Sequence, residues 1–268
     1  RRAMVQVRAA DFVYEDRFLD PYWDERVSGV AQFDGIGYDP VGAFFQRLRG
    51  RDPFFAGYAM RVNRARVVNG AFVDVRTTHY IATEFTPSNG MVDWEGVDVL
   101  DLAANDRAVV PMPSGGRLLA DLAIDATSLV LTPEGVGDDY AASGYVTIGK
   151  EIIRYSAKSG DTLTGLVRGR FNTVPRAHNA FAAVQEAWQY TGPAYLALQA
   201  LLVDFAKVPS SWVPIAEWEA EASVWFPVEV QVVVTSPFSV AKLIGELSIL
   251  GFSLFTDLEA QKIRFRAN

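Results

Sequence analysis

The sequence predicts an α+β fold that is mainly β, with a small antiparallel β-module inserted in it and short helices in its C-terminal third. Up to residue 187, short β-prone runs alternate with turn signals. The longest runs with helical spacing follow Gly192-Pro193. Half of the 268 residues are hydrophobic and 21% are charged, so the chain can bury a substantial core.

The first hundred residues carry short β-like runs and many aromatic residues. Strands are predicted over 59–62, 72–75 and 79–83, separated by Asn69-Gly70 and ended by the Pro87 to Gly90 turn signal. The run 97–105 has the spacing of a short helix.

A Pro-, Ser- and Gly-rich stretch over 111–116 reads as a linker and divides the chain. This linker, together with the change from β-prone runs to helical spacing near residue 188, predicts three regions. They are an N-terminal β-domain over 1–112, a β-module over 117–187 and an α+β domain over 188–268.

The middle region is the most regular. Its β-prone runs are 128–132, 145–148, 151–155 and 162–167. Turns at 133–137, at Gly149-Lys150 and over 158–161 connect them, and the lengths suit tight hairpins. A small antiparallel module is expected.

The last region mixes helices and strands. Helices are predicted over 194–207, 214–224 and 240–250, the last ended by Gly251. A strand is predicted over 228–235, and a closing hairpin pairs 252–255 with 262–266.

Residues 144–150, GYVTIGK, match the opening of a phosphate-binding nucleotide loop. Glu151 stands where such a loop needs Ser or Thr for magnesium, and its charge would repel phosphate. The stretch re-enters a strand at Glu151, where a nucleotide loop would begin a helix. We therefore interpret the match as accidental and Lys150 as a solvent-facing turn residue.

Composition excludes several function classes. A net charge of −7 argues against gripping nucleic acid through its phosphates, and the lack of Cys excludes disulfides and thiol chemistry. No apolar run has the length of a membrane span, and the start lacks the apolar stretch of a signal peptide. The chain begins at Arg1, so it is interpreted as a fragment, a processed product or the ordered part of something longer.

No catalytic, cofactor-binding or metal-binding residue is predicted. His79 and His178 lack partners at ligand spacing and are interpreted as structural. Glu217, Glu219 and Glu221 leave a glycan-degrading enzyme open as an alternative, because a glycosidase needs two carboxylates across a cleft. A solvated face is the favoured interpretation. A carbohydrate-binding module would need exposed Trp188, Trp212 or Trp218 along a groove.

Aromatic residues and arginines interleave between residues 44 and 58. They would suit stacking on nucleic acid, but the acidic chain favours a contact between subunits, where aromatics and Arg are enriched. The candidate subunit-interface residues are Phe44, Phe45, Arg51, Phe54, Phe55 and Tyr58.

Four segments in order resemble the tail-hub, or tail-tip, proteins of long-tailed bacteriophages: 41–62, 78–122, 144–178 and 236–267. The third is similar to a β-module of phage tail and baseplate proteins, with its IG-x-E-II-x-Y, its LTG-x-x-RG and a later His. Asn172-Thr173 stands where that module usually has Gly-Thr, and 178–184 lacks its usual Gly-Asp.

The resemblance implies a non-enzymatic virion protein, made in the host cytoplasm. Such hubs have barrel-like domains, connect the tail tube to distal host-attachment parts and gate the channel for DNA ejection. The implied partners are further copies in a homotrimer, the distal tail protein, the tape-measure protein and tail-fibre or receptor-binding proteins. The resemblance implies no cofactor, and a carbohydrate- or receptor-binding tail module stays the alternative.

Overall fold

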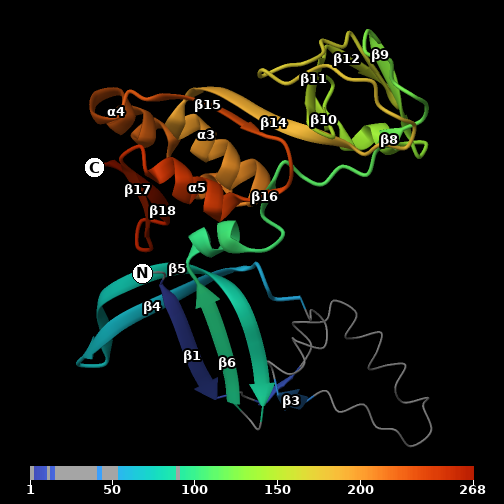
Figure 1. The fold of residues 1–268 in the computed structure, drawn as a ribbon. Coiled ribbons are helices and arrows are strands. Elements are labelled where there is room, and N and C mark those ends of the chain that lie inside the picture. The colour runs from blue at the N-terminus through green and yellow to red at the C-terminus, as the bar shows by residue number, and fades with distance from the viewer. Residues whose placement is uncertain (1–2, 11–12, 16–40, 44–53, 89–90) are drawn as a thin grey trace, which may run out of the picture. The chain divides into compact units, whose positions relative to one another are not determined.

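The computed structural model describes residues 3–10, 13–15, 41–43, 54–88 and 91–268 (Figure 1). The protein is α+β and mainly β, and its sheets are antiparallel; among the described residues none closes into a barrel. The chain forms two compact units. Unit 1 comprises residues 1–101 and 256–261, and unit 2 comprises 102–255 and 262–268.

Unit 1 is built on a four-stranded sheet in the order β1-β6-β5-β4. Its strands are β1 (Met4–Ala10), β4 (Ala59–Val68), β5 (Ala71–Ser88) and β6 (Met91–Val97). The two runs predicted over 72–75 and 79–83 are parts of the single strand β5. A smaller pair joins β2 (Val13–Glu15) to β3 (Val41–Ala43).

The β4–β5 turn is the Asn69-Gly70 pair that the sequence indicates. Both residues have positive φ, 52° and 80°, as a two-residue hairpin turn requires. Tyr80, Ile81 and Phe85 of β5 are buried in the core of unit 1.

Unit 2 begins in the short 3-10 helix η2 (Val99–Ala104), close to the helix predicted over 97–105. After it, β7 (Val109–Val110) pairs with β16 (Phe238–Ser239), far along the chain.

The β-module has two antiparallel sheets. One has the order β12-β13-β9-β8, and its strands are β8 (Arg117–Leu118), β9 (Ser128–Thr132), β12 (Ala157–Ser159) and β13 (Thr162–Thr164). The other has the order β11-β10-β14-β15, and its strands are β10 (Gly144–Ile148), β11 (Glu151–Tyr155), β14 (Val184–Pro193) and β15 (Glu229–Val234). The 3-10 helix η3 (Val136–Asp139) lies between β9 and β10.

The module buries a compact apolar core between these sheets. Its fully buried members include Val146, Ile148, Ile153, Tyr155 and Leu163. Residues 149 and 150 form the β10–β11 turn, with φ of 60° at Gly149 and Lys150 exposed. The hairpin expected in place of a nucleotide loop is confirmed.

Strand β14 joins the module to the C-terminal elements. Its first half pairs with β10, as in Tyr145↔Ala187, and its second half pairs with β15, from Trp188↔Val234 onward. The boundary expected between residues 187 and 188 lies inside this strand.

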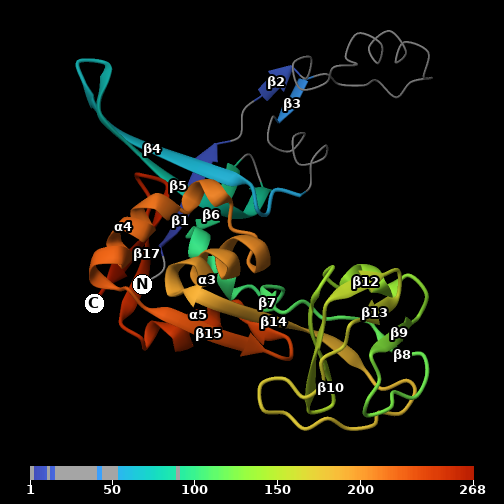
Figure 2. The same ribbon diagram turned by 90° about the horizontal axis from the view of Figure 1, so that it is seen from above.

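The C-terminal elements combine helices with a final hairpin (Figure 2). The helical elements are α3 (Ala194–Ala200), the π-helical turn η4 (Leu201–Phe205), the 3-10 turn η5 (Ser210–Trp212), α4 (Ile215–Trp225) and α5 (Val240–Ser248). The hairpin consists of β17 (Phe252–Asp257) and β18 (Lys262–Ala267). Helix α3 packs against β14, β15 and α4, and α4 packs against β18. In the described part of the chain, no helix is both long and apolar enough to cross a bilayer.

Candidate functional site

The β-module contains a buried ionic network centred on Glu151, the first residue of β11. Its side chain is fully buried. Arg168 donates from Nε to Oε1 and from Nη2 to Oε2, both at 2.8 Å. His178 Nε2 lies 2.7 Å from Oε2, and the backbone N–H groups of Gly169 and Arg176 also donate to the carboxylate, at 3.2 and 3.1 Å.

Arg168 extends this network to the neighbouring loops. Its Nη1 donates to the carbonyl of Ala123 at 2.5 Å, and its Nη2 donates to that of Arg176 at 2.6 Å. The network therefore fastens two loops to the β10–β11 hairpin, one before β9 and one before β14.

The charged form of Glu151 is strongly favoured. Burial raises the pKa of its carboxyl, but the hydrogen bonds from Arg168 and His178 outweigh burial and lower that pKa to about 2. The carboxylate is saturated with donors and closed to solvent, so the arrangement suits a structural anchor rather than catalysis. His178 therefore has an acidic partner, Glu151, that its sequence context did not reveal.

Of the candidate subunit-interface residues, Phe44, Phe45 and Arg51 lie outside the described residues. Phe54 is 80% exposed. Phe55 packs on Phe85, with ring centroids 4.5 Å apart, and its ring also contacts Tyr58 and Trp94. The structure thus brings Phe55 and Tyr58 together.

Beside these rings, unit 1 has an apolar hollow of about 560 Å³. Its lining residues are Val7, Phe55, Tyr58, Ala59, Met60, Arg61, Val62, Asn63, Ala82 and Trp94. Two of the predicted interface residues, Phe55 and Tyr58, therefore line this apolar hollow.

Two carboxylates of α4, Glu217 and Glu221, are bound to the final hairpin, whereas Glu219 lines a groove of about 260 Å³. Glu217 forms ion pairs with Lys262, at 2.5 Å, and with Arg264 of β18. Glu221 accepts the backbone N–H of Ala267 at 3.3 Å. Both side chains therefore hold the helix on the final hairpin.

Two of the three candidate tryptophans for a sugar groove are buried. Trp212 and Trp218 are 2% and 1% exposed. The indole Nε1 of Trp218 donates to the carbonyl of Ile263 at 2.8 Å. Neither ring can stack on a ligand.

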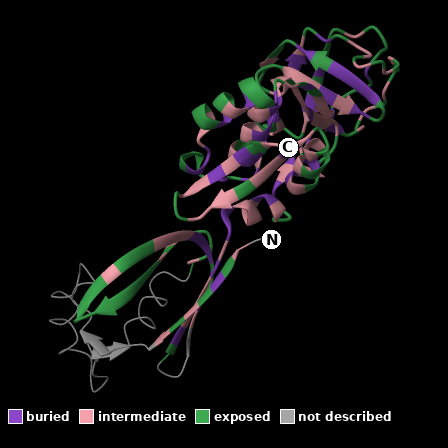
Figure 3. Ribbon diagram, turned by 90° about the vertical axis from the view of Figure 1, so that its left-hand side faces the viewer, coloured by how far each residue is buried: buried purple, intermediate pink, exposed green. Residues whose placement is uncertain are grey.

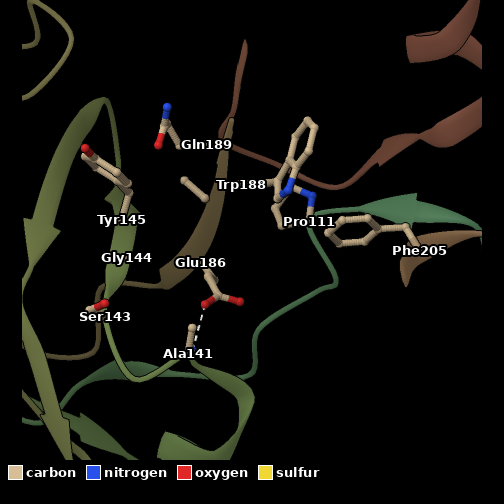
Figure 4. Close-up of a pocket in the computed structure, with 10 residues that line it drawn as sticks. Pro111, Ala141, Ser143, Gly144, Tyr145, Glu186, Trp188, Gln189 and Phe205 are labelled. Atoms are coloured by element: carbon tan, nitrogen blue, oxygen red, sulfur yellow. Dashed lines mark hydrogen bonds between the residues drawn. The ribbon is translucent and has the colours of Figure 1, made fainter. Parts of the chain in front are cut away.

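Trp188, the third, lines a cleft of about 370 Å³ in unit 2 (Figure 4). Pro111 and Phe205 lie beside the indole, which meets the Phe205 ring edge-on at 5.8 Å. Glu186 and Gln189 add a carboxylate and an amide to the lining. An aromatic ring beside polar groups can accommodate a small polar ligand with an apolar face.

His79 of unit 1 is tied to the backbone. Its Nδ1 donates to the carbonyl oxygen of Leu258 at 3.1 Å, and its backbone N–H donates to the same oxygen at 3.0 Å. Among the described residues, no group of three or more His, Asp or Glu side chains is placed to hold a metal ion.

Comparison of the chain with known protein families, curated proteins and solved structures found no match.

Sequence reasoning did not assign a role to Glu151 or Arg168. Both belong to the module motifs, IG-x-E and RG, and His178 is the later His. The signal that could have revealed the network is that all three polar residues belong to the motifs of one module. Buried polar groups need hydrogen-bond partners, so the three residues were candidates to bind one another.

Proposed function

We propose that the chain is a structural, non-enzymatic component of a bacteriophage tail tip, acting as a hub that connects the tail tube to distal host-attachment parts. Its partners are further copies of itself, the distal tail protein, the tape-measure protein and tail-fibre or receptor-binding proteins. In this proposal, strands from several copies together form the barrel-like hub, since no sheet of the described residues closes on itself.

One observation carries the proposal: the ordered motif set, whose charged module residues belong to a single network. Arg168 and His178 lie 17 and 27 residues after Glu151, and both bind its carboxylate. The motif therefore acts as a structural fastening, which supports a scaffold role for the region that carries it.

The exposed apolar surface of unit 1 gives further support. Tyr58 lines the apolar hollow and is 52% exposed, and Phe54, four residues before it in the sequence, is 80% exposed. Exposed aromatic residues grouped in this way are typical of protein interfaces.

Antibody labelling of purified virions, viewed by negative-stain electron microscopy, tests the proposal. We expect label at the tail tip, with three copies around the tail axis. Label on the capsid, or a particle without this chain, would refute it. Antibody absorbed with the purified chain serves as the control.

A second candidate function is binding of a carbohydrate receptor at the Trp188 cleft. It is favoured by the half-buried indole beside Glu186 and Gln189. A glycan array probed with the wild type and with Trp188→Ala tests it: signal lost in the variant supports binding there. Trp225→Ala, which removes an exposed indole elsewhere, is the matched control and should keep the signal. A wild type that binds no glycan on the array would refute this function.

A further inference from the structure

Two strands of unit 1 continue beyond the sheet to which they belong. Strand β6 pairs with β5 only from Ile81 onward, and β1 pairs with β6. Residues 62–78 are therefore a two-stranded hairpin, which we call the arm (Figures 1 and 2). Isolated two-stranded hairpins are marginally stable in water.

The arm exposes apolar side chains. From Asn63 to Arg76 every residue is exposed except Val73, which is half-buried (Figure 3). Val67 and Phe72 face each other in register near the tip, and they are 61% and 76% exposed. The opposite face carries Val68, which is 42% exposed and shares that face with Arg64 because side chains alternate along a strand. A contact that covers either face would remove apolar surface from water and stabilise the hairpin.

The arm also carries unbalanced positive charge. Arg64 and Arg76 are direct cross-strand partners, an arrangement in which like charges destabilise the pair. Arg66 is paired with Asp74 at 3.0 Å, and Asp74 is the single acidic residue of the arm. The surface that fits the arm is therefore apolar and acidic.

Unit 2 carries such a surface at the C-terminal end of α4. A groove of about 260 Å³ is lined there by Tyr195, Phe226 and Pro227, with Glu219 and Glu229 also in its lining. Both carboxylates are exposed, and neither has an ion-pair partner in the described part of the chain. Val224 and Trp225, 65% and 71% exposed, add apolar surface next to it in sequence.

We propose that the arm of one copy docks in the α4 groove of a second copy of this chain. The face of the arm that carries Arg64, Val68 and Arg76 enters the groove. Val68 covers the apolar part of the groove, and Glu219 and Glu229 neutralise Arg64 and Arg76. Because the arm and the groove are different surfaces, the contact is heterologous and closes into a ring if its rotation allows. This proposal rests on the proposed function in one respect: it takes the contact to be one between subunits of the hub.

Charge reversal provides the test. Arg64→Glu/Arg76→Glu keeps a like-charged pair across the hairpin, so the internal repulsion of the arm is preserved while its attraction to the groove is reversed. Glu219→Lys/Glu229→Lys reverses the groove. Lys150→Glu, in the exposed β10–β11 turn, is the control for a general change of charge. Circular dichroism checks that each variant is folded.

Sedimentation velocity over a concentration series measures self-association. We expect the wild type and Lys150→Glu to associate, and each double variant alone to associate about tenfold or more weakly. Mixing the two double variants restores association, because each mixed pair contains one wild-type contact. High salt weakens the wild-type contact.

A wild type that is monomeric at every concentration would overturn the arm contact, as would double variants that associate like the wild type or a mixture without restored association. These failures are separate from failure of the hub proposal. A self-associating chain absent from the virion would refute the hub alone, whereas a monomeric chain found at the tail tip would refute the arm contact alone.

Discussion

The carboxylate of Glu151 and the guanidinium of Arg168 form a two-pronged ion pair with both N···O distances at 2.8 Å. The two side chains are 0% and 8% exposed. Breaking such a pair from one side leaves a buried charge without compensation, which typically costs about 3–5 kcal/mol. We therefore expect Glu151→Gln to destabilise the module by that amount at pH 7.

The same ion pair makes the module sensitive to acid. The folded pKa of Glu151, about 2, lies below its ordinary value of 4.5, so its contribution is fully present above about pH 4.5 and is lost as the pH falls toward 2. A depression of this size corresponds to roughly 3 kcal/mol. The stability difference between wild type and Glu151→Gln should therefore shrink on acidification.

Hydrogen exchange of backbone amides in β10 and β11 measures both effects, because the two units of the chain need not unfold together. Glu134→Gln, at an exposed position of the same module, is the matched control. Equal protection of wild type and Glu151→Gln at pH 7 would contradict a stabilising role for the network.

The hairpin turns could be predicted because each depends on adjacent residues. The Glu151 network could not, because its residues lie far apart in the sequence. The turns at Asn69-Gly70 and Gly149-Lys150 are specified by two adjacent residues, and β9 and β11 have the bounds that were predicted. Strand β14 was not predicted, because its VQEAWQYTGP sequence has no simple alternation of apolar and polar residues. It pairs with β10 in one half and β15 in the other, so different neighbours bury different residues.

The ring cluster around Phe55 was predictable only in part, because its members lie far apart in the sequence. Grouping aromatic residues along the sequence placed Phe55 next to Tyr58, but Phe85 and Trp94, which complete the ring cluster, come from β5 and β6. The arm was missed because its two strands are unremarkable in sequence. Its isolation depends on where β6 stops pairing with β5.

Gly137 is expected to tolerate no side chain. A Cβ there would lie 2.1 Å from the carbonyl oxygen and 2.8 Å from the carbonyl carbon of Gly160, which are backbone atoms. The same turn is held by Asp161, which accepts the N–H groups of Gly135 and Gly137 at 2.8 and 2.6 Å. Gly137→Ala should cost about 1–3 kcal/mol, since the backbone must shift. Hydrogen exchange in β9 and β13 would reveal it; unchanged exchange would contradict the close approach.

Gly245 is expected to respond in the opposite direction. It lies within α5, is exposed, and a Cβ there would meet nothing within 4 Å. Ala has the higher helix propensity, so Gly245→Ala should stabilise α5 by about 0.5–1 kcal/mol. Thermal unfolding followed by circular dichroism tests this, and a lower melting temperature would contradict it.

The indole of Trp218 links α4 to β18 through one buried hydrogen bond. Trp218→Phe removes the donor, leaves the carbonyl of Ile263 without it and creates a small void, so we expect a loss of about 1–3 kcal/mol. Trp225→Phe, on the same helix but 71% exposed, should change stability by no more than about 0.5 kcal/mol. Urea unfolding of both variants makes the comparison. Similar losses in the two would mean that indole size, rather than the Trp218 hydrogen bond, sets the stability of this part of unit 2.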